Sequence, residues 1–218
     1  MIIHKDCYGT ILLVWAISLA AAFVFLRFIP WTLVSYLLTI IPMFFMGFVL
    51  YFFRVPKRQS VGEANDVTAV ADGKIVVIDK VFESEYLNSE CIQVSIYMDF
   101  FNVHVNFWPV SGEVKYYKYH PGKYMLAFLP KASELNEHTS TAISSPFGDI
   151  FFKQIAGTFA RRIVCYATPG QNEEKGTECG IIKFGSRIDM YFPLDADIKV
   201  SLGDYVKASE SIIATLKK

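Results

Sequence analysis

The sequence predicts a mainly β domain with minor helix, preceded by an N-terminal membrane helical hairpin. Two observations lead to this prediction. The first is a run of 43 residues, Ile11 to Phe53, that contains a single charge, Arg27. The second is a series of short β-branched and aromatic segments, broken by Gly, Pro and Asp turns, in the rest of the chain. We expect the hairpin over residues 1–58 and the second domain over residues 59–218.

The apolar run is long enough for two membrane-spanning helices, since each needs about 20 residues. It divides into residues 11–29 and 31–53, and Pro42 should kink the second segment. A re-entrant hairpin, or a cleaved signal peptide ending near residues 20–22, is the alternative. Positive residues flank the run on both sides: Lys5, Arg54, Lys57 and Arg58. Positive flanks favour the cytoplasmic side, so we expect a cell-membrane protein whose second domain lies on the cytoplasmic face.

Charge and composition exclude several classes of protein. The 218 residues contain 21 Lys and Arg against 21 Asp and Glu, a balance that argues against a nucleic-acid partner. The hydrophobic content of 53% excludes a disordered chain. The four cysteines form no CxxC pair, and the sequence has neither a metal-spaced His/Cys cluster nor a Gly-rich phosphate motif. We therefore predict no metal and no nucleotide site.

The second domain reads as short strands after a polar linker at residues 59–69. The predicted strands are Lys74–Ile78, Cys91–Tyr97, Phe101–Phe107, Val114–Tyr119, Tyr124–Phe128, Ile181–Phe184, Ile188–Phe192, Ile198–Ser201 and Ser211–Leu216. Gly turns precede three apolar segments, at Gly73, Gly112 and Gly203. Such turns recur in barrel-sandwich hybrids, so we expect a fold of that kind.

One histidine lies in a pattern that suits chemistry. Period-2 alternation over residues 101–107 places Asn102, His104 and Asn106 on one face of a strand. A histidine among hydrogen-bonding amides can change its protonation state. The alternative is a surface histidine, or one that is only hydrogen-bonded.

Gly185-Ser186 is the only Gly-Ser pair in the chain. This pair predicts either a tight turn or a strained peptide in which the Ser186 hydroxyl reaches the Gly185 carbonyl. In the second case a base makes Ser186 a nucleophile against its own peptide bond. Asp72 is either an Asp-Gly turn residue or the carboxylate that orients a histidine, as in a triad.

Four further residues are candidates for substrate binding. Arg161 and Arg162 are adjacent, and their guanidinium groups can bind phosphate or carboxylate. The alternative is that both lie on a solvated face. Asn136 and His138 belong to a loop-like segment that could line a site.

Six motifs, taken in order, resemble the short-form phosphatidylserine decarboxylase proenzymes. They are Val70-Ala71-Asp72-Gly73-Lys74-Ile75; Phe101 to Asn106 with Pro109-Val110-Ser111-Gly112; His120-Pro121-Gly122-Lys123; Asn136-Glu137; Gln154-Ile155-Ala156-Gly157 with Ala160-Arg161-Arg162-Ile163; and Gly180 to Asp189, which contains Phe184-Gly185-Ser186-Arg187. The resemblance runs from about Gln59 to the C-terminus, and the hairpin also fits.

This resemblance implies a pyruvoyl-dependent enzyme that converts phosphatidylserine in the membrane to phosphatidylethanolamine and CO2. Self-cleavage between Gly185 and Ser186 would leave a β-chain that ends at Gly185 and an α-chain over residues 186–218. The α-chain would begin with a covalent pyruvoyl group made from Ser186, which acts as the electron sink with no metal. The product would be an α/β heterodimer, able to oligomerise further.

The resemblance also implies roles for individual residues. Asp72 matches the acidic member of the self-cleavage triad, and His104 is the expected general acid. Long-form relatives carry a second histidine where this chain has Phe107, so His104 serves self-cleavage, decarboxylation or both. His138 stands where many relatives have an arginine.

Two other functions fit parts of the sequence. A membrane-anchored barrel-sandwich adaptor or binding module would need no chemistry at Ser186 and would remain one chain. A biotin or lipoate carrier would need an exposed lysine at a hairpin tip, for which Lys80 is the candidate.

Overall fold

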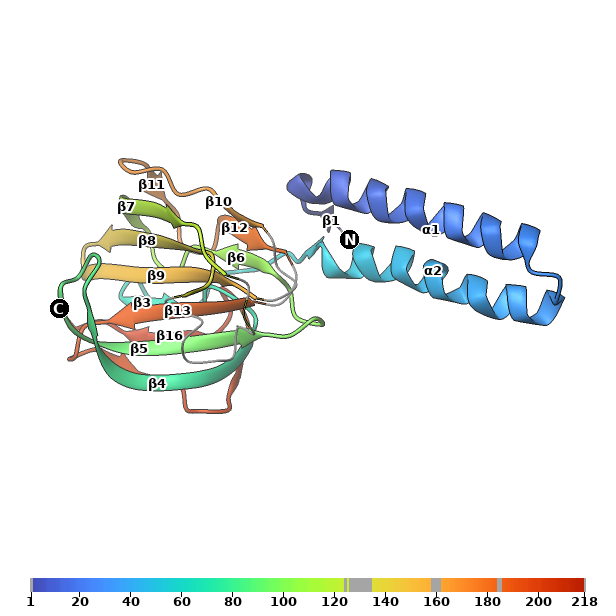
Figure 1. The fold of residues 1–218 in the computed structure, drawn as a ribbon. Coiled ribbons are helices and arrows are strands. Elements are labelled where there is room, and N and C mark those ends of the chain that lie inside the picture. The colour runs from blue at the N-terminus through green and yellow to red at the C-terminus, as the bar shows by residue number, and fades with distance from the viewer. Residues whose placement is uncertain (1, 124, 126–134, 158–161, 184–185, 218) are drawn as a thin grey trace. The chain divides into compact units, whose positions relative to one another are not determined.

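The computed structural model describes residues 2–123, 125, 135–157, 162–183 and 186–217. The chain forms two compact units, Met1–Pro56 and Lys57–Lys218. The first contains the helices and the second contains most of the strands (Figure 1).

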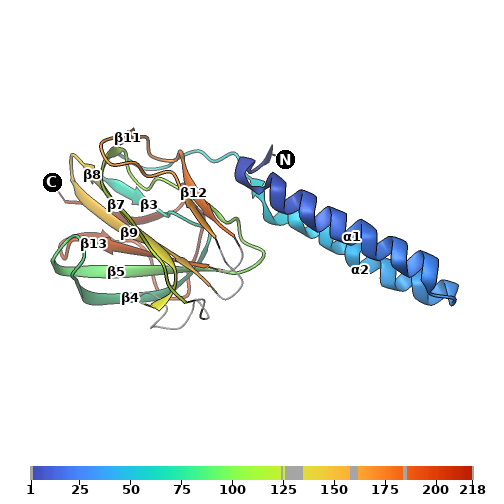
Figure 2. The same cartoon turned by 45° about the horizontal axis from the view of Figure 1, so that its top comes forward.

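The first unit is a helical hairpin. Helices α1 (Tyr8–Phe28) and α2 (Thr32–Phe52) lie side by side in both views (Figures 1 and 2). A 3-10 turn, η1 (Lys5–Cys7), precedes α1, and β1 (Ile2–Ile3) pairs with β2 (Arg54–Val55) at the open end.

The composition of this hairpin suits a membrane. Both helices are long and apolar enough to cross one, with mean hydropathy of 2.4 and 2.2, and most of their large apolar side chains are exposed. Trp15 links the helices through a 3.2 Å hydrogen bond from Nε1 to the carbonyl of Met46. Pro42 lies inside α2, and the predicted spans match the observed helices within three residues at each end.

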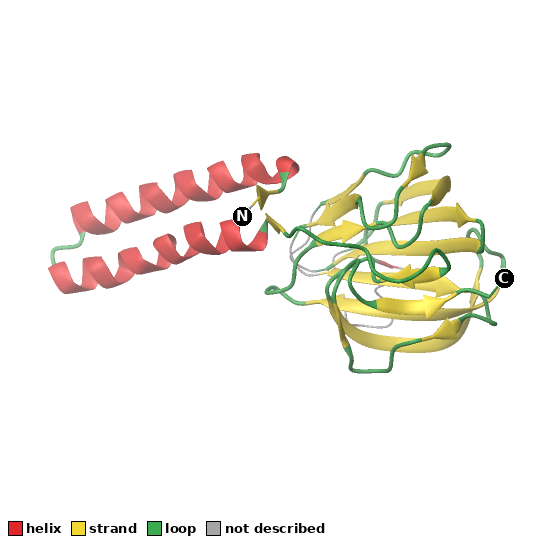
Figure 3. Ribbon diagram, turned by 180° about the vertical axis from the view of Figure 1, so that it is seen from behind, coloured by secondary structure: helices red, strands yellow, loops and turns green. Residues whose placement is uncertain are grey.

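The second unit is built on one curled antiparallel sheet of eight strands (Figures 1 and 3). Its order is β11-β7-β8-β9-β13-β5-β4-β15. In chain order the strands are β4 (Gly73–Glu83), β5 (Ser89–Met98), β7 (Gly112–His120), β8 (His138–Ser145), β9 (Gly148–Ala156), β11 (Asn172–Glu173), β13 (Ser186–Phe192) and β15 (Tyr205–Val206).

Two three-stranded sheets complete the unit. One joins β10 (Ile163–Cys165), β12 (Glu178–Ile182) and β6 (Val105–Phe107), and the other joins β14 (Asp197–Ile198), β16 (Ile212–Thr215) and β3 (Asp66–Thr68). Their apolar side chains and those of one face of the large sheet share a single core, in which Trp108 is fully buried. The half-barrel that results confirms the predicted mainly β fold.

Several predicted segments differ from the observed strands. The strand predicted at 101–107 is wrong over its first half, because residues 99–102 form a turn and β6 begins at Val105. Asp99 stabilises this turn by accepting the backbone N–H of Phe101 at 2.8 Å. The linker predicted at 59–69 contains β3, and the segment Tyr124–Phe128 lies largely outside the described residues.

Candidate active site

Ser186 is the first residue of β13, near the middle of the large sheet. It lies opposite Met98 of β5 on one side and opposite Ala156 of β9 on the other. Ser186 is fully buried. A strand paired on both sides holds its backbone firmly, so the position of Ser186 is set by two ladders of hydrogen bonds.

The Ser186 side chain faces the core. Successive side chains of a strand point to opposite faces, and Ile188 and Met190 of the same strand lie in the core. On that face the Ser186 hydroxyl donates a hydrogen bond to the thioether sulfur of Met98, at 3.0 Å between Oγ and Sδ. A thioether is a weak acceptor and no base, so the hydroxyl is not activated in this conformation.

His104 lies just before β6 and is fully buried. Its ring Nδ1 donates to the carbonyl of Asn102 at 3.1 Å, which leaves Nε2 as the basic nitrogen of the neutral ring. The His104 carbonyl accepts the N–H of Ile182 at 3.2 Å, so His104 lies beside the segment that leads to Ser186. Alternation over residues 101–107 predicted one polar face and one apolar face. The structure shows no such division in burial, because Val103, His104 and Val105 are all buried.

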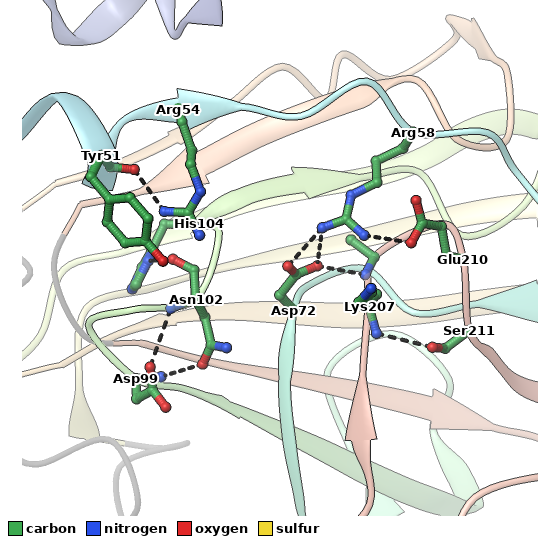
Figure 4. Close-up of polar contacts among 11 residues, drawn as sticks. Tyr51, Arg54, Arg58, Asp72, Asp99, Asn102, His104, Lys207, Glu210 and Ser211 are labelled. Carbon is green, nitrogen blue, oxygen red and sulfur yellow. Dashed lines mark hydrogen bonds and ion pairs between the residues drawn. The ribbon is translucent and has the colours of Figure 1, made fainter. Parts of the chain in front are cut away.

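Asp72 directly precedes β4 and points toward Arg58 (Figure 4). Its carboxylate accepts two hydrogen bonds from Arg58 Nη2, at 3.0 and 2.7 Å, and one from the N–H of Ala208 at 2.8 Å. Burial raises the pKa of Asp72 above its usual value, while Ala208 and Arg58 act in the opposite direction. The charged form of Asp72 therefore depends on these two donors.

Strand register brings Ser186 and Asp72 to one end of the large sheet. Ser186 lies opposite Met98, and the preceding residue of β5, Tyr97, lies opposite Lys74 of β4. Asp72 comes just before β4, so its backbone lies two strands, or about 10 Å, from that of Ser186.

The three residues predicted for the triad share one region without hydrogen-bonding to one another. In the described part of the chain, the Ser186 hydroxyl and the Asp72 carboxylate each have other partners, and neither bonds to His104. Gly185 and Arg161 lie outside the described residues.

Asn136 holds the strand beside Ser186. Its side-chain amide donates to the carbonyls of Ala156, at 2.7 Å, and Met125, at 2.8 Å, and its oxygen accepts the N–H of Met125 at 2.9 Å. Since Ala156 pairs with Ser186, this amide fixes the neighbouring strand end. Arg162 is exposed, and its carbonyl accepts the N–H of Lys183 at 3.2 Å.

Glu85, His120 and His138 form a cluster whose ligand atoms all lie within 4.8 Å of one another. His120 Nε2 bonds Glu85 at 2.5 Å, and His138 Nδ1 donates to the carbonyl of Asn136 at 2.7 Å. The hydrogen bonds that Glu85 accepts outweigh its burial and lower its pKa to about 2, whereas burial lowers the pKa of His138.

The geometry of this cluster suits an ion-pair network better than a metal ion. The two imidazole rings are stacked, 4.4 Å apart and 14° from parallel. Ring lone pairs lie in the ring plane, so one ion cannot lie in both planes unless a ring turns. Lys153 also places its ammonium 3.1 Å from Glu85, where it competes with a cation.

The face of β13 opposite to Ser186 carries buried charges. Arg187 and Asp189 form a paired contact with two hydrogen bonds, at 2.7 and 2.9 Å. A cavity of about 310 Å³ opens on this face and is lined by Arg187, Lys153, Glu83 and Tyr191 among others. This cavity lies across the sheet from the Ser186 hydroxyl and does not include it.

Two residues of the site, Met98 and Arg58, were not identified from the sequence. Met98 lies one residue beyond the predicted strand Cys91–Tyr97, at the end of β5, and strand pairing is needed to place it against Ser186. Arg58 was assigned to the positive flank of the hairpin, yet its side chain is 7% exposed and paired with two carboxylates. A charge sign is visible in a sequence, but the partner of that charge is not.

Comparisons with known proteins agree with the motifs. A family model described as phosphatidylserine decarboxylase matches residues 45–214. A phosphatidylserine decarboxylase proenzyme of Amoebophilus asiaticus is 48% identical over 169 residues, which cover 77% of this chain and 75% of the relative. Proenzymes of Cytophaga hutchinsonii and Parabacteroides distasonis are 42% and 37% identical, over 98% and 100% of both chains respectively.

Proposed function

The chain belongs to the phosphatidylserine decarboxylase family and converts phosphatidylserine to phosphatidylethanolamine and CO2, and on that premise we propose that Ser186 makes its catalytic group by self-cleavage. The assignment favours an enzyme over the adaptor that the sequence also allowed. The carrier alternative has no structural support, because Lys80 lies within β4 and not at a hairpin tip.

The observation that carries the proposal is the place of Ser186. It is a fully buried serine at the very start of a central strand, directly after the predicted scissile bond. The described contact of its hydroxyl is to a thioether, which is easily exchanged for a base.

In the proposed self-cleavage, Ser186 Oγ attacks the carbonyl carbon of Gly185 while a base takes the hydroxyl proton. The peptide C–N bond breaks, the nitrogen takes up a proton, and an ester joins the two residues. Loss of the Cα proton of Ser186 then expels the Gly185 carboxylate. Water hydrolyses the remaining unsaturated residue and ammonia leaves. A pyruvoyl group then remains at the N-terminus of the α-chain. Every atom comes from the chain and one water molecule.

The surroundings of Ser186 fit a pyruvoyl group. The group is covalent and comparable in size to the serine it replaces, and its strand neighbours Met98 and Ala156 are apolar and fully buried. When present, the group supplies an electron sink for the carboxylate electrons of the substrate.

His104 and Asp72 have the proposed proton-transfer roles. The Asn102 carbonyl fixes the His104 ring so that Nε2 can take or return a proton. Asp72 is the proposed acidic member of this set, at the same end of the large sheet as Ser186. The proposed substrate-binding residues are Arg161, Arg162, Asn136 and His138. Of the two arginines, Arg162 lies within the described residues and is exposed.

We also propose the setting of the reaction. The two apolar helices anchor the enzyme in the cell membrane, where phosphatidylserine resides, and Lys5, Arg54 and Lys57 favour the cytoplasmic side. The working form is an α/β heterodimer, because the strands on both sides of β13 belong to the β-chain and retain the α-chain after cleavage.

The test compares Ser186→Ala with Ser95→Ala in the full chain. Ser95 is also fully buried, on the neighbouring strand β5, and has no part in the proposed chemistry. We expect two chains and activity in the Ser95 variant, and one chain without activity in the Ser186 variant. N-terminal sequencing of the wild-type α-chain should give no signal, because a pyruvoyl group has no free amine. An active Ser186→Ala protein would refute the proposal.

A further inference from the structure

Arg58 is the second residue of the second unit and is held between two carboxylates (Figure 4). Its Nη2 contacts both oxygens of Asp72, at 2.7 and 3.0 Å, and its Nη1 contacts Glu210 at 2.9 Å. The Arg58 side chain is only 7% exposed. Solvent therefore screens this pair less than a surface ion pair.

Arg58 and Ala208 together fix the direction of the Asp72 carboxylate. The N–H of Ala208 donates to Oδ1 at 2.8 Å, while Arg58 reaches both oxygens. With donors from two segments, the carboxylate has one preferred orientation. Removal of Arg58 leaves a single backbone donor, about which the carboxylate can turn.

Arg58 also matters for the charge on Asp72. Side-chain exposure of Asp72 is 12%, and a carboxylate buried to this extent prefers the neutral form unless a cation lies nearby. Two charged groups act on Asp72: Arg58 favours the ionised form, and Glu210 opposes it. Lys207 is in the same turn as Glu210, and its backbone N–H donates to Ser211 Oγ at 3.0 Å (Figure 4).

We propose that Arg58 is a positioning residue for self-cleavage, which holds the Asp72 carboxylate in its working orientation and in its charged state. This inference rests on the proposed role of Asp72 in self-cleavage. Arg58 lies six residues after Phe52, the last residue of α2. The segment that follows the hairpin would therefore contribute to self-cleavage. A version of the enzyme that starts at Gln59 would lack this contact.

The test measures the rate of self-cleavage of newly made full-length chain against pH. The wild-type rate should rise as Asp72 ionises. In Arg58→Gln the favourable charge is lost, so this rise moves to higher pH and the rate at pH 7 falls about 10- to 100-fold. Arg58→Lys keeps the charge without the two-oxygen contact and should recover part of the rate. In Glu210→Gln an opposing charge is lost, so the rise should move to lower pH.

The opposite signs of the two shifts separate positioning from mere stability, since general destabilisation would move both profiles alike. Should Arg58→Gln fail to fold, Arg58→Lys and Glu210→Gln still decide the matter. Wild-type profiles in both of those variants, or in a folded Arg58→Gln, would overturn the inference. Asp72→Asn tests the premise separately: normal cleavage there refutes the role of Asp72. Slow cleavage there, with a normal Arg58→Gln, refutes only the role of Arg58.

Discussion

Ser186 and Met98 face each other across the β5–β13 pair, and the serine hydroxyl donates to the methionine sulfur at 3.0 Å. Both side chains are fully buried. The proposed nucleophile therefore donates to a weak acceptor, and self-cleavage would require its hydroxyl to leave this contact. On the proposed mechanism, Met98 is the partner of this hydroxyl before self-cleavage.

Replacement of Met98 by Leu tests this resting contact. Leu keeps the volume and removes the sulfur acceptor. We expect the uncleaved protein to lose about 1 kcal/mol of stability, and the freed hydroxyl to cleave several-fold faster. Met190→Leu, in the core of β13 without a contact to Ser186, is the matched control for thermal unfolding and cleavage kinetics. Cleavage at least ten times slower in Met98→Leu alone would mean that Met98 assists the reaction.

His104→Ala tests the dual role of the histidine. We expect slow and incomplete self-cleavage, and in the cleaved fraction a decarboxylation rate about 10²- to 10⁴-fold lower, because the general acid is missing. Gel densitometry of the two chains and CO2 release measure the two effects separately. Normal cleavage with poor turnover would leave His104 to decarboxylation only. Normal values of both would remove His104 from the site.

Carbonyl reagents test the pyruvoyl group directly. Hydroxylamine, or borohydride added together with phosphatidylserine, should inactivate the cleaved enzyme by reacting at the α-chain terminus. Chelators should leave activity unchanged, because the proposed chemistry uses no metal. Resistance to both carbonyl reagents, or strict loss of activity on chelation, contradicts the pyruvoyl proposal.

Gly73→Ala tests the close packing next to Asp72. A Cβ at position 73 would lie 2.2 Å from the backbone carbonyl oxygen of Tyr97, so β4 and β5 would have to separate. We expect a loss of about 1–3 kcal/mol in the free energy of unfolding and slower self-cleavage. Gly47→Ala, inside α2 with nothing within 4 Å, should lose neither. Equal stability and equal cleavage rates in the two variants would contradict the close approach of Gly73 to the Tyr97 carbonyl.

Much of the fold could be predicted from local patterns. The two helices follow from the apolar run, and β4, β5, β7, β12, β13 and β16 coincide with β-branched segments. The central strand β8 was missed, because His138 to Thr141 are polar and yet buried. Its neighbour β9 was also missed. Polarity argues for a loop only when the residues are exposed, and burial here depends on strands far away in the chain.

The site was predicted less completely than the fold. Motif order made Ser186, Asp72 and His104 the candidate residues, because each belongs to a short local pattern. Alternation misplaced His104 within a strand, since a turn at residues 99–102 breaks the period. The partners of these residues come from distant segments: Arg58 reaches Asp72, and Met98 reaches Ser186. Such pairings depend on strand register, which a single sequence does not show.

The intact mass of the purified full-length protein distinguishes a self-cleaving enzyme from an uncleaved one. Self-cleavage predicts two chains, Met1 to Gly185 and an α-chain from residue 186 to Lys218. The α-chain should be lighter than its unmodified sequence by one ammonia, because the pyruvoyl group replaces an N-terminal serine. The Ser186→Ala protein should give one mass for the whole chain. A wild-type protein that shows a single uncleaved mass and still releases CO2 from phosphatidylserine would rule out self-cleavage at Ser186 as the source of the catalytic group.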